Sequence, residues 1–256
     1  MAGNYVKSLI SLALFGMSAW ACAQAQPALR VLSGGAAKAL VQPMTDSFRG
    51  AGGETAQVDY QPMGTLVKSL AAGTPVDVVV VTEEVLASLQ ADGRLPLGVG
   101  RPIARVGVGV AVNERAPLPD ISNAEAFRRT LLAAKSIVYI DPKTGTSGKH
   151  VAEVLARLGI ANEVNAKATL AQGGYIVEPV GRGEIELGIH QISEILPVKG
   201  IRLVGPLPPE LQKYTVYVAV PVPATSKRAL AESYIGHLVG PQARERLAAA
   251  GYTAPQ

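Results

Sequence analysis

The sequence predicts an α/β fold in which parallel-rich sheets are covered by helices. Short apolar runs alternate along the chain with longer stretches whose apolar residues recur at helical spacing, as in strand–helix units. The four valines that follow Asp77 are typical of a strand buried on both faces. The 256 residues, 48% hydrophobic and 17% charged, provide ample material for a core.

In the first half of the chain, helices are expected to follow strands. Leu40, Met44 and Phe48 recur at helical spacing and predict a helix over residues 36–48, in which Pro43 introduces a kink or moves the start. Thr82 is a suitable N-cap for a later helix. The expected strands of this half are residues 29–32, 55–60, 77–81 and 105–112, with a further helix after Thr65.

The same alternation continues in the second half. A loop over residues 141–148 precedes a helix whose apolar positions share one face, and Gly159 is suited to its C-cap. The expected strands are residues 136–140, 166–170, 185–190, 201–204 and 215–220, and the expected helices are residues 125–134, 149–158, 226–239 and 242–250.

The N-terminus has the features of a cleaved export signal. Lys7 provides a positive region, residues 9–21 are apolar, and small residues then match the small-x-small cleavage rule. We therefore expect residues 1–25 to be a signal peptide and the mature protein to be soluble and periplasmic. A buried N-terminal helix is one alternative. A lipid-modified Cys22 is the other, which the bulky Trp20 disfavours.

Composition excludes several classes of function. The net charge of +4 comes from 24 basic and 20 acidic side chains that are scattered, so no nucleic-acid partner is expected. One Cys excludes a disulfide framework and a multi-cysteine metal site. His150, His190 and His237 lack metal-ligand spacing, so neither a metal nor a cofactor is expected.

Glycine accompanied by Ser, Thr or Gln follows many of the expected strands. Ligands of parallel sheets bind beyond the carboxyl ends of the strands, and helix N-termini there bind anions through free N–H groups. Together these loops predict an oxyanion pocket, although each one alone is also explained by ordinary turn and cap chemistry. The loops are residues 33–37, 61–65, 144–148, 172–175 and 190–194.

Familiar catalytic motifs are incomplete. Lys143 stands where a phosphate loop needs glycine, and His150 stands where it needs Ser or Thr. Ser147 lies in a Gly-Thr-Ser-Gly sequence, which is not a nucleophile elbow. His190 ends an apolar strand and is also explained as a structural histidine.

Several segments in order resemble the type II periplasmic solute-binding proteins, in particular the molybdate-binding branch. The segments are residues 31–36, 64–66, 72–78, 141–148 and 183–189. The resemblance implies a two-lobed α/β fold with a hinge of crossing strands, the ligand between the lobes, and a monomer. It places lobe 1 at residues 26–105 plus 221–256 and lobe 2 at residues 106–220.

The chain departs from the molybdate binders at the ligand. Ala36, Gly64 (or its neighbour Met63) and Gln191 stand where that branch has two Ser and one Tyr. Each hydrogen bond to a charged group is worth about 1.5–3 kcal/mol, so the losses disfavour molybdate. Residues 191–197 resemble a divergent branch that includes the periplasmic aconitate isomerases, which favours an organic polycarboxylate.

The expected ligand-binding residues lie in the strand-end loops, with Lys149 or Arg182 as alternative sources of positive charge. They are Ser33, Gly34, Gly35, Ala36, Lys38, Gly64, Thr65, Thr146, Ser147, Gly148, Gln191 and Ser193.

Two functions of different classes compete. The first is a binding protein that captures a small anion and delivers it to the membrane subunits of an ABC transporter. The second is an isomerase that interconverts trans- and cis-aconitate and requires a base, for which His150, His190 and Glu194 are the candidates. A signalling or scavenging receptor without a transporter is a third reading.

Overall fold

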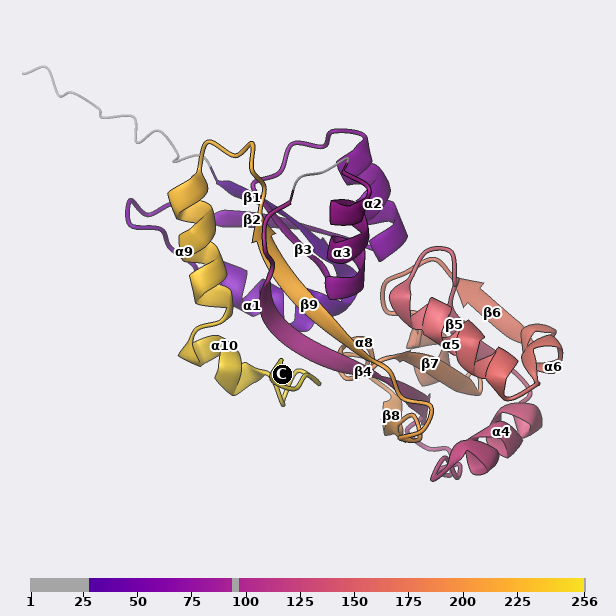
Figure 1. Ribbon diagram of the computed structural model, residues 1–256. Coiled ribbons are helices and arrows are strands. Elements are labelled where there is room, and N and C mark those ends of the chain that lie inside the picture. Colours follow the sequence, from indigo (N-terminus) through magenta and orange to yellow (C-terminus); the bar gives the residue numbers. More distant parts are fainter. Residues whose placement is uncertain (1–27, 94–96, 256) are drawn as a thin grey trace, which may run out of the picture.

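The computed structural model describes residues 28–93 and 97–255, so the expected signal peptide lies outside the described residues. The chain forms two α/β lobes joined by two long strands, β4 (Arg101–Asn113) and β9 (Tyr214–Pro221) (Figure 1). The predicted two-lobed α/β architecture is confirmed. Among the described residues, no helix combines the length and the apolar character needed to cross a membrane.

Lobe 1 contains a sheet with strand order β2-β1-β3-β9-β4. The first three strands are parallel, and β9 runs antiparallel to both of its neighbours. In Figure 1, α1 and α9 lie on one side of this sheet and α2 and α3 on the other. The strands not yet given are β1 (Leu29–Gly34), β2 (Ala56–Gln61) and β3 (Val78–Thr82), and the helices are η1 (Gly35–Ala37), α1 (Lys38–Ser47), α2 (Met63–Ala71), α3 (Glu83–Ala91), α9 (Arg228–Leu238) and α10 (Pro241–Arg246).

Lobe 2 contains the order β4-β7-β5-β6, with β8 also paired to β4. β5 runs parallel to both β6 and β7. Its strands are β5 (Ile137–Ile140), β6 (Ala168–Ala171), β7 (Leu187–Gln191) and β8 (Ile201–Pro206). Its helices are α4 (Ala124–Ala133), α5 (Thr146–Arg157), α6 (Ala161–Asn165), α7 (Glu178–Gly181) and α8 (Ile192–Ile195).

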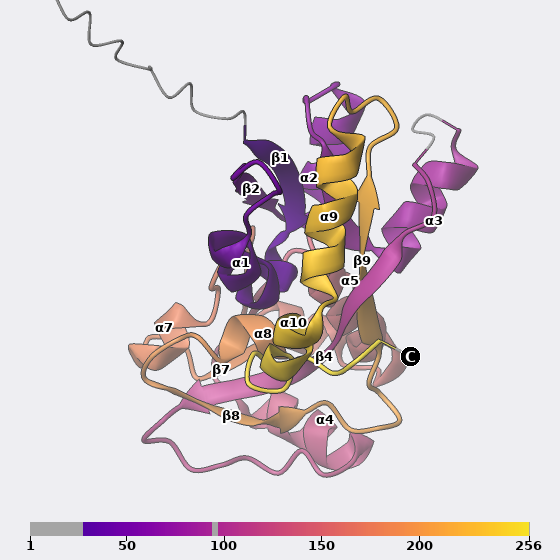
Figure 2. The same cartoon turned by 90° about the vertical axis from the view of Figure 1, so that its left-hand side faces the viewer.

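Each lobe has its own hydrophobic core. The valine run of β3 is fully buried in the core of lobe 1, as its sequence predicts. Val106 packs into that core, whereas Val108 packs into the core of lobe 2. β4 therefore passes from one lobe to the other at Gly107, and Figure 2 shows it running diagonally between them.

Several elements differ from the sequence prediction. α5 begins at Thr146, three residues earlier than expected, because Gly145 is an extended N-cap and Gly148 lets the first turn pack tightly on β5. A Cβ at Gly148 would lie 2.1 Å from the Ile140 carbonyl oxygen. A 3-10 turn precedes α1, and the short helices α6, α7 and α8 were not among the expected helices. β4 begins at Arg101, four residues before the expected strand.

Candidate functional site

A cavity of about 250 Å³ lies between the lobes, at the carboxyl ends of β1, β2, β5 and β7. Lobe 1 lines it with Gly35, Ala36, Lys38, Tyr60, Gln61, Pro62 and Met63. Lobe 2 lines it with Ile140, Gly145, Thr146, Ser147, Gly173, Gly174, Tyr175, His190, Gln191 and Glu194, and β9 adds Tyr217. Chain segments that are far apart in the sequence thus meet at one site.

A hydrogen-bonded chain of three buried side chains forms one wall of the cavity. The Ser147 Oγ atom lies 3.1 Å from Nδ1 of His190. On the other side of the imidazole, Nε2 lies 3.0 Å from Oε2 of Glu194. The side chain of His190 is 1% exposed and that of Glu194 11%. α5, β7 and α8 each supply one member, so the rigid elements of lobe 2 fix the arrangement.

A tyrosine from the connecting strand enters the site beside this wall. The Tyr217 hydroxyl donates to Oε1 of Gln191 at 3.2 Å, and Gln191 donates through Nε2 to the Thr215 hydroxyl. Burial raises the pKa of Tyr217 well above its ordinary value, and the nearby Glu194 carboxylate raises it further. Tyr217 is therefore a neutral proton donor at physiological pH.

Lys38 supplies positive charge to the cavity. Its Nζ atom lies 5.5 Å from the ring centroid of Tyr60 and 5.7 Å from that of Tyr175. The Tyr60 hydroxyl is buried and has no hydrogen-bond partner among the described residues. Burial raises the pKa of Tyr60, so this hydroxyl also remains neutral. A ligand anion placed here would have a cation and a free hydroxyl within the same part of the cavity.

The N-terminus of α5 faces the cavity through Thr146 and Ser147. This helix has 12 residues, and the amides of its first turn have no acceptor one turn earlier within the helix. These N–H groups and the helix dipole favour negative charge at this end of the cavity.

Six of the predicted ligand residues do not line the cavity. Ser193 donates its hydroxyl proton to the Ala36 carbonyl at 2.8 Å and so holds the first loop in place. The Gly64 amide donates to the Thr144 carbonyl at 3.0 Å, which is a contact between the lobes. The other four are Ser33, Gly34, Thr65 and Gly148.

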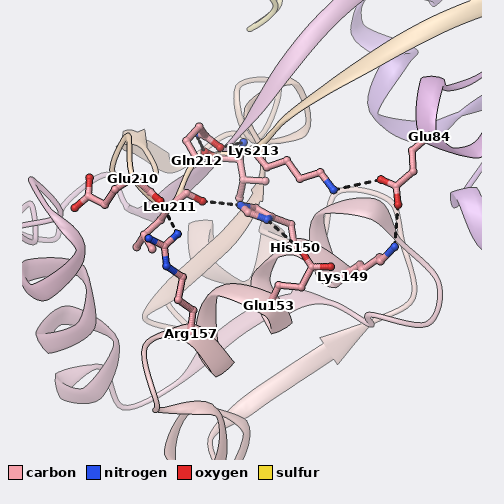
Figure 3. Close-up of polar contacts among 10 residues, drawn as sticks. Glu84, Lys149, His150, Glu153, Arg157, Glu210, Leu211, Gln212 and Lys213 are labelled. Carbon is pink, nitrogen blue, oxygen red and sulfur yellow. Dashed lines mark hydrogen bonds and ion pairs between the residues drawn. The ribbon is translucent and has the colours of Figure 1, made fainter.

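Two of the three base candidates, His190 and Glu194, come together, whereas His150 does not join them. Figure 3 shows His150 beneath the loop that precedes β9, where its Nε2 donates to the Leu211 carbonyl at 2.8 Å. It does not line the cavity, because it lies on the part of α5 that faces this loop. His150 is therefore apart from the side chains of the cavity wall.

The two alternative sources of charge also lie elsewhere. Lys149 pairs with Glu84 at 2.8 Å, and Lys213 reaches the same carboxylate at 3.3 Å (Figure 3). Arg182 pairs with Glu184 on the surface of lobe 2. The Glu84 contacts connect α3 of lobe 1 to α5 and to the segment before β9, and so bridge the lobes.

Sequence reasoning missed the three tyrosines of the cavity. Tyr175 lies in a predicted strand-end loop, and this position was the available signal. Tyr60 and Tyr217 lie within predicted strands, where aromatic residues are ordinary core residues. Gln191 stands where the molybdate-binding branch has a tyrosine. Tyr217, 26 residues further along the chain, places a tyrosine hydroxyl beside Gln191 instead.

No group of three or more His, Cys, Asp or Glu side chains in residues 28–93 and 97–255 is arranged to hold a metal ion. The donors of the cavity are hydroxyls, amides, one imidazole and one lysine, which suit an anion.

Comparisons with known proteins agree with this architecture. The family of bacterial extracellular solute-binding proteins matches residues 29–253. An aconitate isomerase from Pseudomonas sp is 30% identical over 235 residues, which span 90% of this chain and 88% of that protein. The Azotobacter vinelandii periplasmic molybdate-binding protein has a TM-score of 0.73 and 19% identity, over 89% of this chain and 100% of that one. The sulfate-binding protein SubI from Mycobacterium tuberculosis H37Rv has a TM-score of 0.70 and 17% identity, over 90% of this chain and 87% of that one. From its fold, its interlobe cavity and the match over residues 29–253, the chain belongs to the bacterial extracellular solute-binding proteins.

Proposed function

We propose that this protein binds a small organic polycarboxylate in the cavity between its lobes. The observation that carries the proposal is the separation of anion-binding groups across the cavity. Lys38 comes from lobe 1 and the N-terminus of α5 from lobe 2. A ligand with carboxylates at both ends satisfies both groups and favours the approach of the lobes.

A compact inorganic oxyanion fits the cavity less well. Glycine and alanine occupy the first loop at Gly35 and Ala36, so no hydroxyl is offered from there. Glu194 also faces the cavity, and a carboxylate repels an anion that carries no proton. An organic acid can place carbon near Glu194 and its charges elsewhere.

The proposed location is the periplasm, after removal of residues 1–25 as a signal peptide. A monomer would collect the ligand there and deliver it to the membrane subunits of an ABC transporter. The resemblance of the N-terminal sequence to export signals and the family description support this part of the proposal.

A second candidate, an aconitate isomerase type of activity, is favoured by the His190–Glu194 pair. A buried carboxylate that faces the cavity repels an anionic ligand, so anion binding alone does not account for the position of Glu194. An isomerase needs such a group to remove a proton from carbon. The Oε1 atom of Glu194 lies beside Gly35, where an added Cβ would approach it to 3.2 Å. The similarity to the aconitate isomerase of Pseudomonas sp supports the same candidate.

A proton NMR time course with trans-aconitate tests both functions. Purified protein lacking residues 1–25 would be mixed with excess trans-aconitate at neutral pH, beside a Glu194→Gln variant. Conversion to the cis isomer by the unmodified protein alone would establish the isomerase. Line broadening without conversion would establish polycarboxylate binding. If neither occurs, and citrate and other tricarboxylates give no calorimetric signal either, the polycarboxylate proposal is wrong.

A further inference from the structure

We propose that Ser147 is an activated nucleophile and that the cavity carries an acyl-transfer activity toward small carboxylic esters. This activity goes beyond polycarboxylate binding and isomerisation, because it gives covalent chemistry to a side chain that otherwise lines the cavity. It rests on the order of hydrogen bonds along Ser147, His190 and Glu194.

The proton positions in this chain follow from the acceptors around His190. The Nε2 atom faces two acceptors, the Glu194 carboxylate at 3.0 Å and the Gly174 carbonyl at 3.3 Å. Nε2 must therefore carry a proton. In the neutral ring Nδ1 then carries the lone pair and acts as the acceptor. The Ser147 hydroxyl, 3.1 Å away, donates its proton to Nδ1. Every hydrogen bond in the chain points from the serine toward the carboxylate.

This direction is the one that activates a serine. A base takes the hydroxyl proton while a carboxylate on the far side of the ring orients and stabilises the imidazolium. Burial strengthens the arrangement, because Ser147 is 3% exposed and His190 1%, so water competes little for these hydrogen bonds.

The surroundings of Ser147 supply the other parts of an acyl-transfer site. Ser147 is in the first turn of α5, whose free amides can stabilise a negative oxygen that develops on an attacked carbonyl. Lys38 lines the same cavity and can hold a carboxylate on the acyl or alcohol part. The cavity of about 250 Å³ limits the substrate to small esters.

The reaction is balanced with water as the second reactant. Oγ of Ser147 bonds to the ester carbonyl carbon while its proton passes to Nδ1 of His190. The tetrahedral oxyanion collapses, the bond from carbon to the alkoxy oxygen breaks, and the alcohol leaves with the proton from Nδ1. Water then attacks the acyl-serine and gives a proton to Nδ1, and that proton returns to Oγ as the free acid leaves.

The chain contains a matched control for this inference. Ser47 also contacts a histidine, because its Oγ lies 3.0 Å from Nε2 of His237. This second pair is exposed and has no carboxylate hydrogen-bonded to the ring among the described residues. A serine–histidine contact alone therefore does not distinguish Ser147, whereas the carboxylate and the cavity do.

The test uses diisopropyl fluorophosphate and p-nitrophenyl acetate on the protein without residues 1–25. We expect one phosphoryl adduct, mapped to Ser147 by peptide mass spectrometry, and slow ester hydrolysis. Ser147→Ala should lower hydrolysis by about 100-fold or more, and Glu194→Gln by about 10-fold or more. Ser47→Ala should leave labelling and hydrolysis unchanged.

An unlabelled Ser147, or full hydrolysis by Ser147→Ala, would overturn the inference. Because the adduct is mapped on the unmodified protein, the inference stays testable even if Ser147→Ala folds poorly. The outcome is separable from the proposed function. Polycarboxylate binding measured by calorimetry can succeed while labelling fails, and labelling can succeed without polycarboxylate binding.

Discussion

At the scale of single residues, a glycine in the loop after β1 leaves the Glu194 carboxylate open to a ligand in the cavity. Gly35 lies next to the carboxylate, and any Cβ there approaches Oε1 to 3.2 Å. Gly34 is under a different constraint, because its Cβ would lie 2.2 Å from Cε of Met63 and 3.0 Å from the ring of Tyr217. Gly34 thus allows Met63 and Tyr217 to pack closely against the backbone, and Gly35 leaves the Glu194 carboxylate open to a ligand.

Gly35→Ala is therefore expected to impair the site without unfolding the protein. The methyl group would crowd Oε1 of Glu194 and reduce isomerase turnover, or ligand affinity, by about 10-fold, equivalent to about 1.4 kcal/mol. Turnover by NMR and affinity by calorimetry check this. Gly236→Ala is the control, because a Cβ there meets nothing within 4 Å. An unchanged site in Gly35→Ala would contradict the role assigned to Gly35.

Lys38→Met should weaken polycarboxylate binding by removing the charge and keeping most of the side-chain volume. Loss of a charge-assisted hydrogen bond of about 1.5–3 kcal/mol corresponds to a rise in Kd of roughly 10- to 150-fold. Lys68→Met, on the exposed face of α2, is the control and should leave Kd unchanged. Equal affinities of the two variants would show that Lys38 does not contribute to ligand binding.

At the scale of elements, Glu84 connects α3 of lobe 1 to α5 of lobe 2. Its carboxylate meets Lys149 at 2.8 Å and Lys213 at 3.3 Å, with all three side chains about half exposed. Exposed ion pairs of this kind contribute about 0–1 kcal/mol each and weaken with salt. The bridge is therefore a modest and salt-dependent stabiliser of the contact between the lobes.

Glu84→Gln should raise the Kd for the ligand by a few-fold at low salt, because the apposed lobes lose this bridge. The difference from the unmodified protein should disappear near 1 M salt, where the Debye length is about 3 Å. Calorimetry at the two salt concentrations provides the measurement. Glu232→Gln is the control, since Glu232 pairs with Arg228 within α9. A salt-independent loss of affinity would show that Glu84 acts by another route.

Elements with strong local sequence patterns could be predicted from the sequence. The tertiary contacts between these elements could not. The valine run fixed β3, and alternating strands and helices fixed the fold class. The start of α5 was missed because the packing of Gly148 on Ile140 is a tertiary contact. Ser147 and His190 are 43 residues apart, so their hydrogen bond follows from the placement of α5 beside β7.

At the scale of the whole molecule, Asp77 joins β1, near the start of the described chain, to the segment between β9 and α9. Its carboxylate accepts from the Arg30 amide at 2.8 Å and the Thr225 hydroxyl at 2.7 Å, and it lies 3.5 Å from Nζ of Lys227. Burial alone would raise the pKa of Asp77, but the two hydrogen bonds and the Lys227 charge outweigh it and lower the pKa. The charged form is therefore the form that stabilises lobe 1.

This shift predicts how stability depends on pH. A carboxyl with a lowered pKa in the folded state contributes fully above its unfolded pKa of about 3.9 and loses that contribution as the pH falls through the folded value. Asp77→Asn should lower the free energy of unfolding at pH 7 by about 1.5–3 kcal/mol and flatten the loss below pH 4. Urea unfolding at several pH values measures this, with Asp59→Asn on the exposed face of β2 as control. Parallel pH profiles for Asp77→Asn and the unmodified protein would contradict the assignment.

The position of β9 in the sheet has a consequence for how the chain is made. β9 lies between β3 and β4 in lobe 1, yet it is the last strand to be synthesised. Because synthesis proceeds from the N-terminus, the position between β3 and β4 stays unfilled until residue 221 has emerged. The strands of lobe 2, from β4 to β8, follow one another along the chain and are all synthesised before β9. The sheet of lobe 1 is therefore completed only after nearly the whole chain has been made.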